Sequence, residues 1–300
     1  MKIKVASLFS GCGGLDFGFH ADPHFEIIFA LDSDKDACGS YQNYYEHTPI
    51  CKDIRKVQTI PDCDIMLGGF PCQGFSIANP KRNKKDERNE LYLELVRLLK
   101  LKNPACFVFE NVKGIMSLDK GIIFENILLE LRDCGYEVYT KLFKMKNYGV
   151  PQNRERVIIL GIRKDHGAQV NFEWPKETLT LTLTLRETIG DLPLKYDESI
   201  QHIGSKNKVR VNGYVGGRVL DWDKISPTII GGRKGGGFIS PIHPSQERRL
   251  TVREVARIQT FPDDFEFKGS MTSMYRQIGN AVPPKFSVIL SSLVKVLIPI

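Results

Sequence analysis

Strand-like apolar segments alternate with helix-like segments over the first half of the chain, and this alternation limits the fold more than any other feature. The strand-like segments are residues 4–9, 25–31, 64–67 and 105–110. The helix-like segments are residues 15–20, 34–45, 89–101 and 122–134. This order predicts an α/β protein with a doubly wound, mostly parallel sheet and helices on both faces. Residues 137–143 and 156–162 follow each other closely enough to pair as antiparallel strands.

The composition changes after Arg163. Residues 178–185 alternate strictly between Thr and Leu, which is typical of a strand. Eight glycines lie within residues 213–237, interspersed with Arg and Lys. From residue 275 the chain is again helix-like and apolar. We therefore predict a catalytic and cofactor-binding domain from residues 1–172 plus 271–300, and a smaller β- and loop-rich domain from residues 173–270.

The net charge of +7 is concentrated in one part of the chain. Residues 200–257 contain 11 Lys or Arg and 4 Asp or Glu, so this segment holds the entire excess. Such a distribution favours a polyanionic partner, although a solvated basic surface is the alternative. The 7 cysteines include no CxxC pair, which predicts a reduced, cytoplasmic protein without metal. The apolar C-terminal segment is too short to span a membrane, and we expect it to pack on the core.

A glycine-rich turn, Gly11–Gly14, separates the first strand from the first helix. Glycines at this position let the backbone approach a ligand closely. Asp32 ends the second strand, where an acid commonly binds ribose hydroxyls, and Asp53 follows the next helix. Together they predict a nucleoside-containing cofactor. A dinucleotide oxidoreductase is disfavoured because the turn lacks the G-x-G-x-x-G pattern.

Four further polar residues are predicted at the same edge of the sheet. Cys72 lies in the segment GGFPCQGFS after a short apolar strand, and Glu110 follows the strand-like residues 105–109. Arg154 and Arg156 precede the strand at 156–162. Taken singly, each has a structural alternative: a buried cysteine, a helix cap or a salt bridge.

The order of the motifs resembles that of the bacterial DNA (cytosine-5) methyltransferases. The motifs are FSGCGG (9–14), GGFPCQGFS (68–76), ENV (110–112), QNRER (152–156), RRLTVREVARIQTFP (248–262) and YRQIGNAVPP (275–284). The resemblance extends from the first strand to the last helix and is weak only over about residues 165–245. In this family, that part is the variable target-recognition region.

The resemblance implies a Rossmann-like methyltransferase fold and roles for the four polar residues. Cys72 would add to C6 of cytosine, which activates C5 for attack on the methyl group of S-adenosyl-L-methionine. Glu110 would bind the N3/N4 edge of the base and favour protonation at N3. Arg156 would contact O2, and Arg154 would support the same pocket.

The resemblance also implies a cofactor site. Its residues would be Phe9, Gly11, Gly13, Leu15, Asp32, Asp53, Ile54, Leu91, Asn280 and Val282. Position 33 departs from the family pattern, because many relatives place a large apolar side chain against the adenine and this chain has Ser33.

The implied substrate is a cytosine flipped out of duplex DNA at a specific short sequence, within a restriction-modification system. We expect a monomer with neither metal nor membrane partner. Two alternatives remain: a tRNA cytosine-5 methyltransferase of the same family, and a catalytically silent DNA-binding relative. The basic, glycine-rich insert favours duplex DNA over tRNA, and the intact Cys72, Glu110, Arg154 and Arg156 argue against a silent protein.

Overall fold

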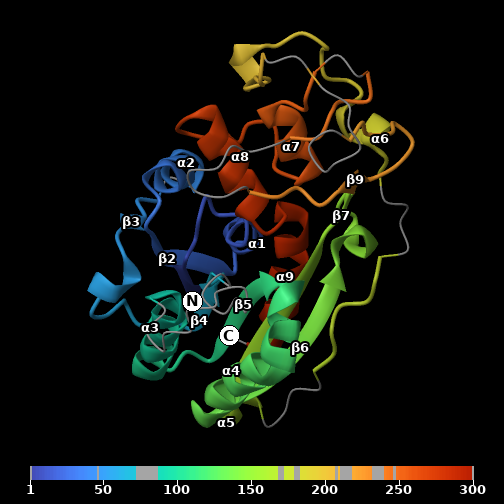
Figure 1. Cartoon of the computed structure of the whole chain (residues 1–300). Coiled ribbons are helices and arrows are strands. Elements are labelled where there is room, and N and C mark those ends of the chain that lie inside the picture. The colour runs from blue at the N-terminus through green and yellow to red at the C-terminus, as the bar shows by residue number, and fades with distance from the viewer. Residues whose placement is uncertain are drawn as a thin grey trace.

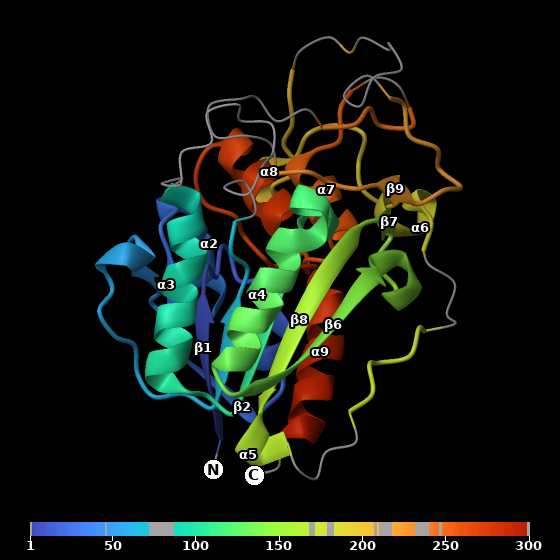
Figure 2. The same cartoon turned by 60° about the horizontal axis from the view of Figure 1, so that its bottom comes forward.

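The computed structural model describes residues 2–45, 47–71, 87–167, 172–178, 183–206, 209, 218–231, 240–245 and 248–298. Its centre is a seven-stranded sheet in the order β3-β2-β1-β4-β5-β8-β6 (Figures 1 and 2). The strands are β1 (Ile3–Leu8), β2 (Phe25–Asp32), β3 (Ile50–Cys51), β4 (Ile65–Gly68), β5 (Cys106–Val112), β6 (Tyr136–Lys144) and β8 (Glu155–Arg163). The first five are parallel, and β8 is antiparallel to both of its neighbours. The predictions of a mostly parallel sheet and of antiparallel pairing between residues 137–143 and 156–162 are confirmed.

Helices cover both faces of the sheet, because the buried strands are apolar on both sides. On one face, α3 (Glu87–Lys102) and α4 (Ile122–Asp133) pack on a cluster that includes Phe107 and Phe109. On the other, α1 (Phe17–Ala21) and α9 (Pro284–Leu297) pack on a cluster that includes Cys106 and Val108. Figure 2 shows α3 and α4 in front of the sheet and α9 behind it. The apolar C-terminal segment is therefore a core helix, as predicted.

A third apolar cluster joins the segment after residue 183 to the edge of the sheet. It combines α2 (Lys35–Tyr45), α6 (Leu185–Ile189), α7 (Val252–Ile258) and α8 (Met271–Asn280). Figure 1 shows α7 and α8 above α1 and α9, with α6 beside them. The division at residues 173 and 270 remains a prediction, but α7 packs together with α2 and α8 in this cluster.

The strand expected at residues 178–185 is wrong at its described end, since Leu185 begins helix α6. Thr184 accepts a hydrogen bond from the Glu187 backbone N–H, and the Glu187 carboxylate accepts one from the Thr184 backbone N–H. This capping box outweighs the alternating pattern. Residues 179–182 lie outside the described part of the chain.

The remaining elements are short. They are η1 (Ile54–Lys56), η3 (Lys113–Gly121), η4 (Met145–Tyr148), β7 (Gln152–Asn153), α5 (Lys164–Gly167), η5 (Glu198–Ile200) and β9 (Ser226–Pro227). β7 and β9 pair in parallel and connect the sheet domain to the loop-rich segment. Across the described ranges, no helix is long and apolar enough to cross a membrane. Within those same ranges, no group of three His, Cys, Asp or Glu could hold a metal ion.

Candidate active site

A cavity of about 480 Å³ lies at the carboxyl ends of the parallel strands, where ligands of open α/β sheets collect. Its walls come from the glycine-rich turn after β1, the ends of β2, β4 and β5, the start of β8 and the turn between α8 and α9. β8 is antiparallel to β5, so its first residues reach the same edge as the last residues of β5. One cavity therefore touches segments that are far apart in the sequence.

The turn after β1 has a backbone that only glycine adopts without strain at two positions. Gly11 and Gly13 have φ angles of 56° and 91°. A Cβ on Gly13 would lie 2.2 Å from the Tyr45 ring, and one on Gly14 would lie 2.3 Å from the Val282 carbonyl oxygen. The glycines thus let α2 and the α8–α9 turn close around one end of the cavity.

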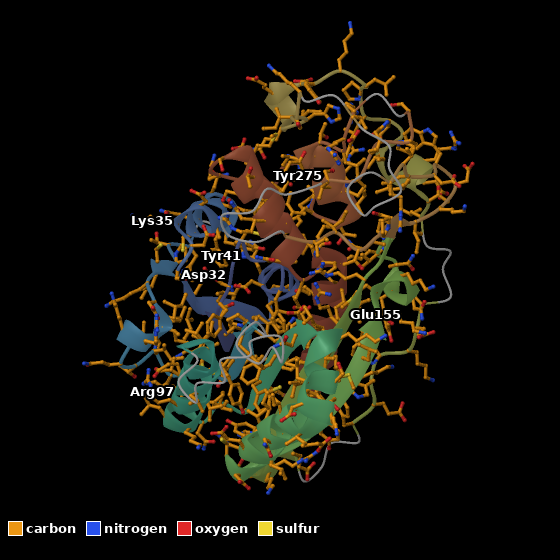
Figure 3. The ribbon with its side chains drawn as sticks, in the orientation of Figure 1. Asp32, Lys35, Tyr41, Arg97, Glu155 and Tyr275 are labelled. Carbon is orange, nitrogen blue, oxygen red and sulfur yellow. The ribbon has the colours of Figure 1, made fainter. Side chains whose placement is uncertain are left out.

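Asp32 lies at this end, at the last position of β2 (Figure 3). Its two carboxylate oxygens accept hydrogen bonds of 2.8 Å from the backbone N–H groups of Gly11 and Asp34. Burial raises the pKa of Asp32, while these two donors oppose that rise. Asp34 forms a 2.7 Å ion pair with Arg276 of α8. The carboxylate of Asp32 is therefore held in place by the main chain.

Glu110 and Arg156 line the other end of the cavity. Glu110 Oε1 lies 2.7 Å from Arg156 Nε, and both residues are buried. No donor in the described ranges makes a well-aligned hydrogen bond to Glu110 Oε1. Glu110 does not end its strand as expected, because β5 continues to Val112 through its pairing with β8. The helix-capping alternative for Glu110 is not supported, since Val112 is the N-cap of η3.

The main chain that leads to Cys72 borders the same end of the cavity. Phe70 and Pro71 line it, and the Asn111 side-chain amide donates a 3.0 Å hydrogen bond to the Phe70 carbonyl. This bond ties the turn after β4 to the end of β5. Cys72 itself lies outside the described residues.

Arg154 is fully buried and is not part of the cavity wall. Its guanidinium donates to the carbonyl oxygens of Ile229, Gly279 and Ala281 at 2.9–3.1 Å. Burial lowers its pKa from the ordinary value of an arginine. These contacts fit a supporting role, because they connect β7 and β8 to the α8–α9 turn.

The structure brings six of the ten predicted cofactor residues to the cavity wall. They are Phe9, Gly11, Leu15, Asp32, Asn280 and Val282. Gly13 shapes the turn instead, Ile54 is part of the core, and Leu91 packs against that core. Asp53 caps η1 and forms a 2.6 Å ion pair with Arg55. Ser33 is exposed and does not line the cavity.

Some cavity residues were not predicted from the sequence, because their positions depend on tertiary contacts. Asp16, Asn111, Arg276 and Gln277 all line the cavity. Asn111, Arg276 and Gln277 lie inside the motifs at 110–112 and 275–284, which was the available signal. Asp16 follows the glycine-rich turn and has no such signal.

This doubly wound sheet, with a cavity at the carboxyl ends of its parallel strands, has relatives among solved structures. The Dnmt2 methyltransferase of S. pombe superposes with a TM-score of 0.72 at 23% identity, over 98% of this chain and 99% of that one. DNMT2 of Spodoptera frugiperda superposes with a TM-score of 0.76 at 20% identity, over the same shares. The fold is the Rossmann-like fold of these methyltransferases.

Sequence comparison identifies one family among the methyltransferases with this fold. The model of the C-5 cytosine-specific DNA methylases matches residues 3–216 and 196–295. Type II methyltransferase M.NgoFVII of Neisseria gonorrhoeae is 37% identical over 100% of this chain and 87% of its own length. M.MthTI of Methanothermobacter thermautotrophicus is 36% identical over 98% of both chains. The chain belongs to the C-5 cytosine-specific DNA methylase family.

Proposed function

We propose that this enzyme transfers a methyl group from S-adenosyl-L-methionine to C5 of a cytosine that is flipped out of a specific short sequence in duplex DNA. One observation carries the proposal. A single cavity has the main-chain-bound carboxylate of Asp32 at one end and the Glu110–Arg156 pair, with the main chain leading to Cys72, at the other. Such a cavity can hold a nucleoside cofactor and a base side by side.

The residues at the Asp32 end fit S-adenosyl-L-methionine. A cavity of about 480 Å³ suits a ligand of this size. Asp32 is placed to accept hydrogen bonds from ribose hydroxyls, since each of its oxygens has a second lone pair beyond the backbone bond it accepts. Asn280, Val282 and Leu15 would contact the remainder of the cofactor. When bound, the cofactor supplies an electrophilic methyl group.

The residues at the other end suit a cytosine ring. Cys72 as a thiolate would add to C6, which makes C5 nucleophilic toward the methyl group. Glu110, whose Oε1 makes no aligned hydrogen bond within the described ranges, would bind the N3/N4 edge and favour protonation at N3. Arg156 would contact O2 while it holds Glu110 in place. Loss of the C5 proton and expulsion of Cys72 would then restore the aromatic ring.

Recognition of DNA is assigned to residues 173–270, with the excess positive charge of residues 200–257 facing the phosphates. The names of the relatives as Type II methyltransferases support a role beside a restriction endonuclease. We expect the enzyme to act as a cytoplasmic monomer.

The test uses covalent trapping. Random-sequence DNA is first methylated with the purified enzyme, and bisulfite sequencing then locates the target cytosine. A duplex with 5-fluorocytosine at that position should form an adduct that requires S-adenosyl-L-methionine and survives denaturing gels, because fluorine at C5 cannot leave as a proton does.

Cys72→Ala should abolish this adduct, whereas Cys51→Ala, at an exposed cysteine of β3, should retain it. An adduct that persists in Cys72→Ala would contradict the mechanism. Methylation of transfer RNA with no modification of DNA would instead identify the substrate as RNA.

A further inference from the structure

Asp16 is a buried acid in the cavity wall with no role in the chemistry described above. Its side chain is 0% exposed, and it lines the cavity next to the glycine-rich turn. Its oxygens accept hydrogen bonds of 2.8 Å from the Ser7 hydroxyl and 2.7 Å from the Tyr41 hydroxyl. Tyr41 lies on α2, close to the end of β2 (Figure 3). Two neutral donors thus hold the carboxylate in a fixed position.

The charges around Asp16 do not balance. Within the described ranges, no Lys, Arg or His forms an ion pair with Asp16 or with Asp32, and the nearby Arg276 is paired with Asp34. Ser7, Tyr41, Tyr45 and Cys12 also surround it, and burial raises the pKa of Cys12 and of both tyrosines. These groups are therefore neutral near pH 7. This end of the cavity keeps uncompensated negative charge.

A buried carboxylate without a counterion is unfavourable unless it takes up a proton or a ligand supplies the positive charge, and above pH 6 only the ligand remains. At the other end of the cavity, Glu110 and Arg156 neutralise each other's charge, so that end does not require a cationic ligand. The ligand expected at the Asp16 end is therefore a cation, and the cavity should distinguish ligands of similar shape by their charge.

We infer that Asp16 determines specificity for the charged form of the cofactor: its carboxylate favours the sulfonium of S-adenosyl-L-methionine over the neutral thioether of S-adenosyl-L-homocysteine, the product. This inference rests on the proposed function. The two molecules share adenosine and the amino-acid group, so Asp32 and Asn280 serve both alike. Only the charge on sulfur differs, and Asp16 would help release the product after methyl transfer.

Cofactor binding should therefore be coupled to the loss of a proton from Asp16. Burial raises the pKa of Asp16 to about 6, against the hydrogen bonds from Tyr41 and Ser7. A cation in the cavity favours the ionised carboxylate and lowers this pKa again. Affinity for S-adenosyl-L-methionine should consequently rise as the pH rises through about 6 and then level off. Affinity for S-adenosyl-L-homocysteine should change much less.

Calorimetric titration of the purified enzyme with each ligand, from pH 5 to pH 8, tests the inference. Affinity for S-adenosyl-L-methionine should increase about fivefold or more over this range, because one pKa unit corresponds to a tenfold change. Binding at pH 6, measured in buffers of different ionisation enthalpy, should release about half a proton. Asp16→Asn should weaken S-adenosyl-L-methionine about tenfold at pH 7.5, with less than about a threefold effect on S-adenosyl-L-homocysteine.

Tyr41→Phe is the matched variant, since it keeps the carboxylate but removes one of its two donors. It should move the pH midpoint upward and leave the affinity at pH 8 nearly unchanged. An unchanged ratio of the two affinities in Asp16→Asn, or a pH midpoint unmoved in Tyr41→Phe, would overturn the inference. If the wild-type enzyme binds neither ligand at any pH, the proposed function itself fails.

Discussion

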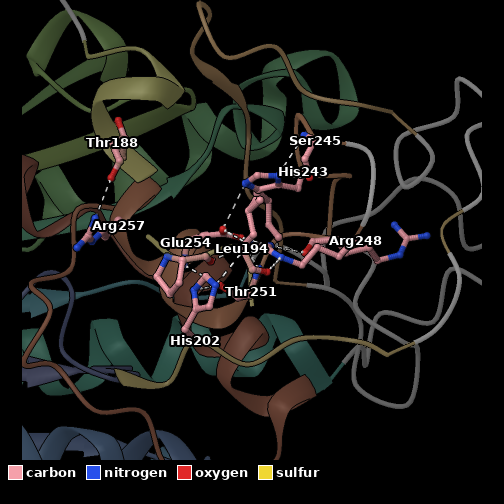
Figure 4. Close-up of polar contacts among 12 residues, drawn as sticks. Thr188, Leu194, His202, His243, Ser245, Arg248, Thr251, Glu254 and Arg257 are labelled. Atoms are coloured by element: carbon pink, nitrogen blue, oxygen red, sulfur yellow. Dashed lines mark hydrogen bonds and ion pairs between the residues drawn. The ribbon is translucent and has the colours of Figure 1, made fainter. Parts of the chain in front are cut away.

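Two polar clusters in the described part of the chain each contain a fully buried carboxylate, and they differ in how its charge is compensated. The recognition cluster lies within residues 173–270 and consists of His202, His243, Arg248, Thr251 and Glu254 (Figure 4). The cavity carboxylates are Asp16, Asp32 and Asp34. Glu254 in the first cluster and Asp16 in the second are removed from water, which costs several kcal/mol per ion unless partners compensate.

The recognition cluster supplies its own partners. Arg248 forms a bidentate pair with Glu254 at 2.7 and 2.8 Å and also donates to the Leu194 carbonyl. Glu254 accepts from the Thr251 backbone N–H, and Thr251 Oγ1 lies 3.0 Å from His202 Nδ1. The cavity carboxylates have one cation, Arg276, for three acids. We infer that a closed cluster, whose charges are paired within the protein, stabilises the fold. An open cluster, which keeps unpaired charge, marks the place of a ligand.

The largest expected effect on stability comes from removing the negative charge of the closed cluster. Glu254→Gln leaves the Arg248 guanidinium buried without a counter-charge and should lower the free energy of unfolding by about 3–5 kcal/mol. Chemical denaturation measures this loss. Glu187→Gln is the matched control, because Glu187 occupies the same N3 position of a capping box in α6 but is exposed.

The control should lose less than about 1 kcal/mol, because glutamine can still accept the N-cap hydrogen bond at position N3. Equal losses in the two variants would mean that the Arg248–Glu254 pair adds nothing beyond the cap. The recognition cluster would then not differ from an ordinary helix start.

The sequence predicted the parts of this structure that depend on local patterns. The parallel strands, the antiparallel pair of β6 and β8, and the C-terminal helices follow from apolar periodicity and spacing. The position of Asp32 was also predictable. The second strand is parallel to the first, so an acid at its end lies at the same edge of the sheet as the glycine-rich turn.

Side-chain direction and long-range pairing could not be predicted. Arg154 and Arg156 are two residues apart, yet Arg154 donates to carbonyl groups in the core and Arg156 lines the cavity. Asp53 occupies the expected position along the chain, but it caps η1. The recognition cluster joins His202 to residues about fifty positions later, and no periodic pattern encodes that pairing.

The second expected effect has the opposite sign and tests the open cluster. Asp16→Asn should raise the free energy of unfolding by about 2 kcal/mol at pH 7.5, since it removes a buried charge. Its amide oxygen can accept from one of the two hydroxyls of Ser7 and Tyr41, and the other hydroxyl can accept from the amide NH2. The pKa of Asp16 is raised to about 6 in the folded state, so the contribution of Asp16 to stability is most favourable below about pH 4 and is lost as the pH rises through 6. The gain in the variant should therefore vanish near pH 4.

Asp22→Asn provides the contrasting control. Despite a small desolvation penalty, the pKa of Asp22 is lowered to about 2 by hydrogen bonds from His24 and by Lys295. The stability it contributes is present at neutral pH, so this variant should be less stable there than the wild type. A loss of stability in Asp16→Asn as well would mean that the cavity carboxylates are compensated by the protein itself.

The smallest expected effect concerns His202, which is fully buried between Thr251 and Arg248. Burial lowers its pKa below the ordinary value of about 6.5, although Glu254 opposes that shift.

Well above pH 6.5, neither the folded nor the unfolded state protonates the His202 ring, so the stability does not depend on pH through this residue. As the pH falls below 6.5 the unfolded state takes up a proton that the folded state excludes, and the recognition cluster loses stability. The difference in unfolding free energy between wild type and His202→Gln should thus shrink between pH 6.5 and 5.5, by at most about 1 kcal/mol. His166→Gln, at an exposed histidine of α5 outside the cluster, is the control for general effects of replacing a histidine by glutamine. A difference that stays constant with pH would mean that the cluster accommodates a protonated His202. The cluster would then accept an additional positive charge, as we infer for the cavity carboxylates.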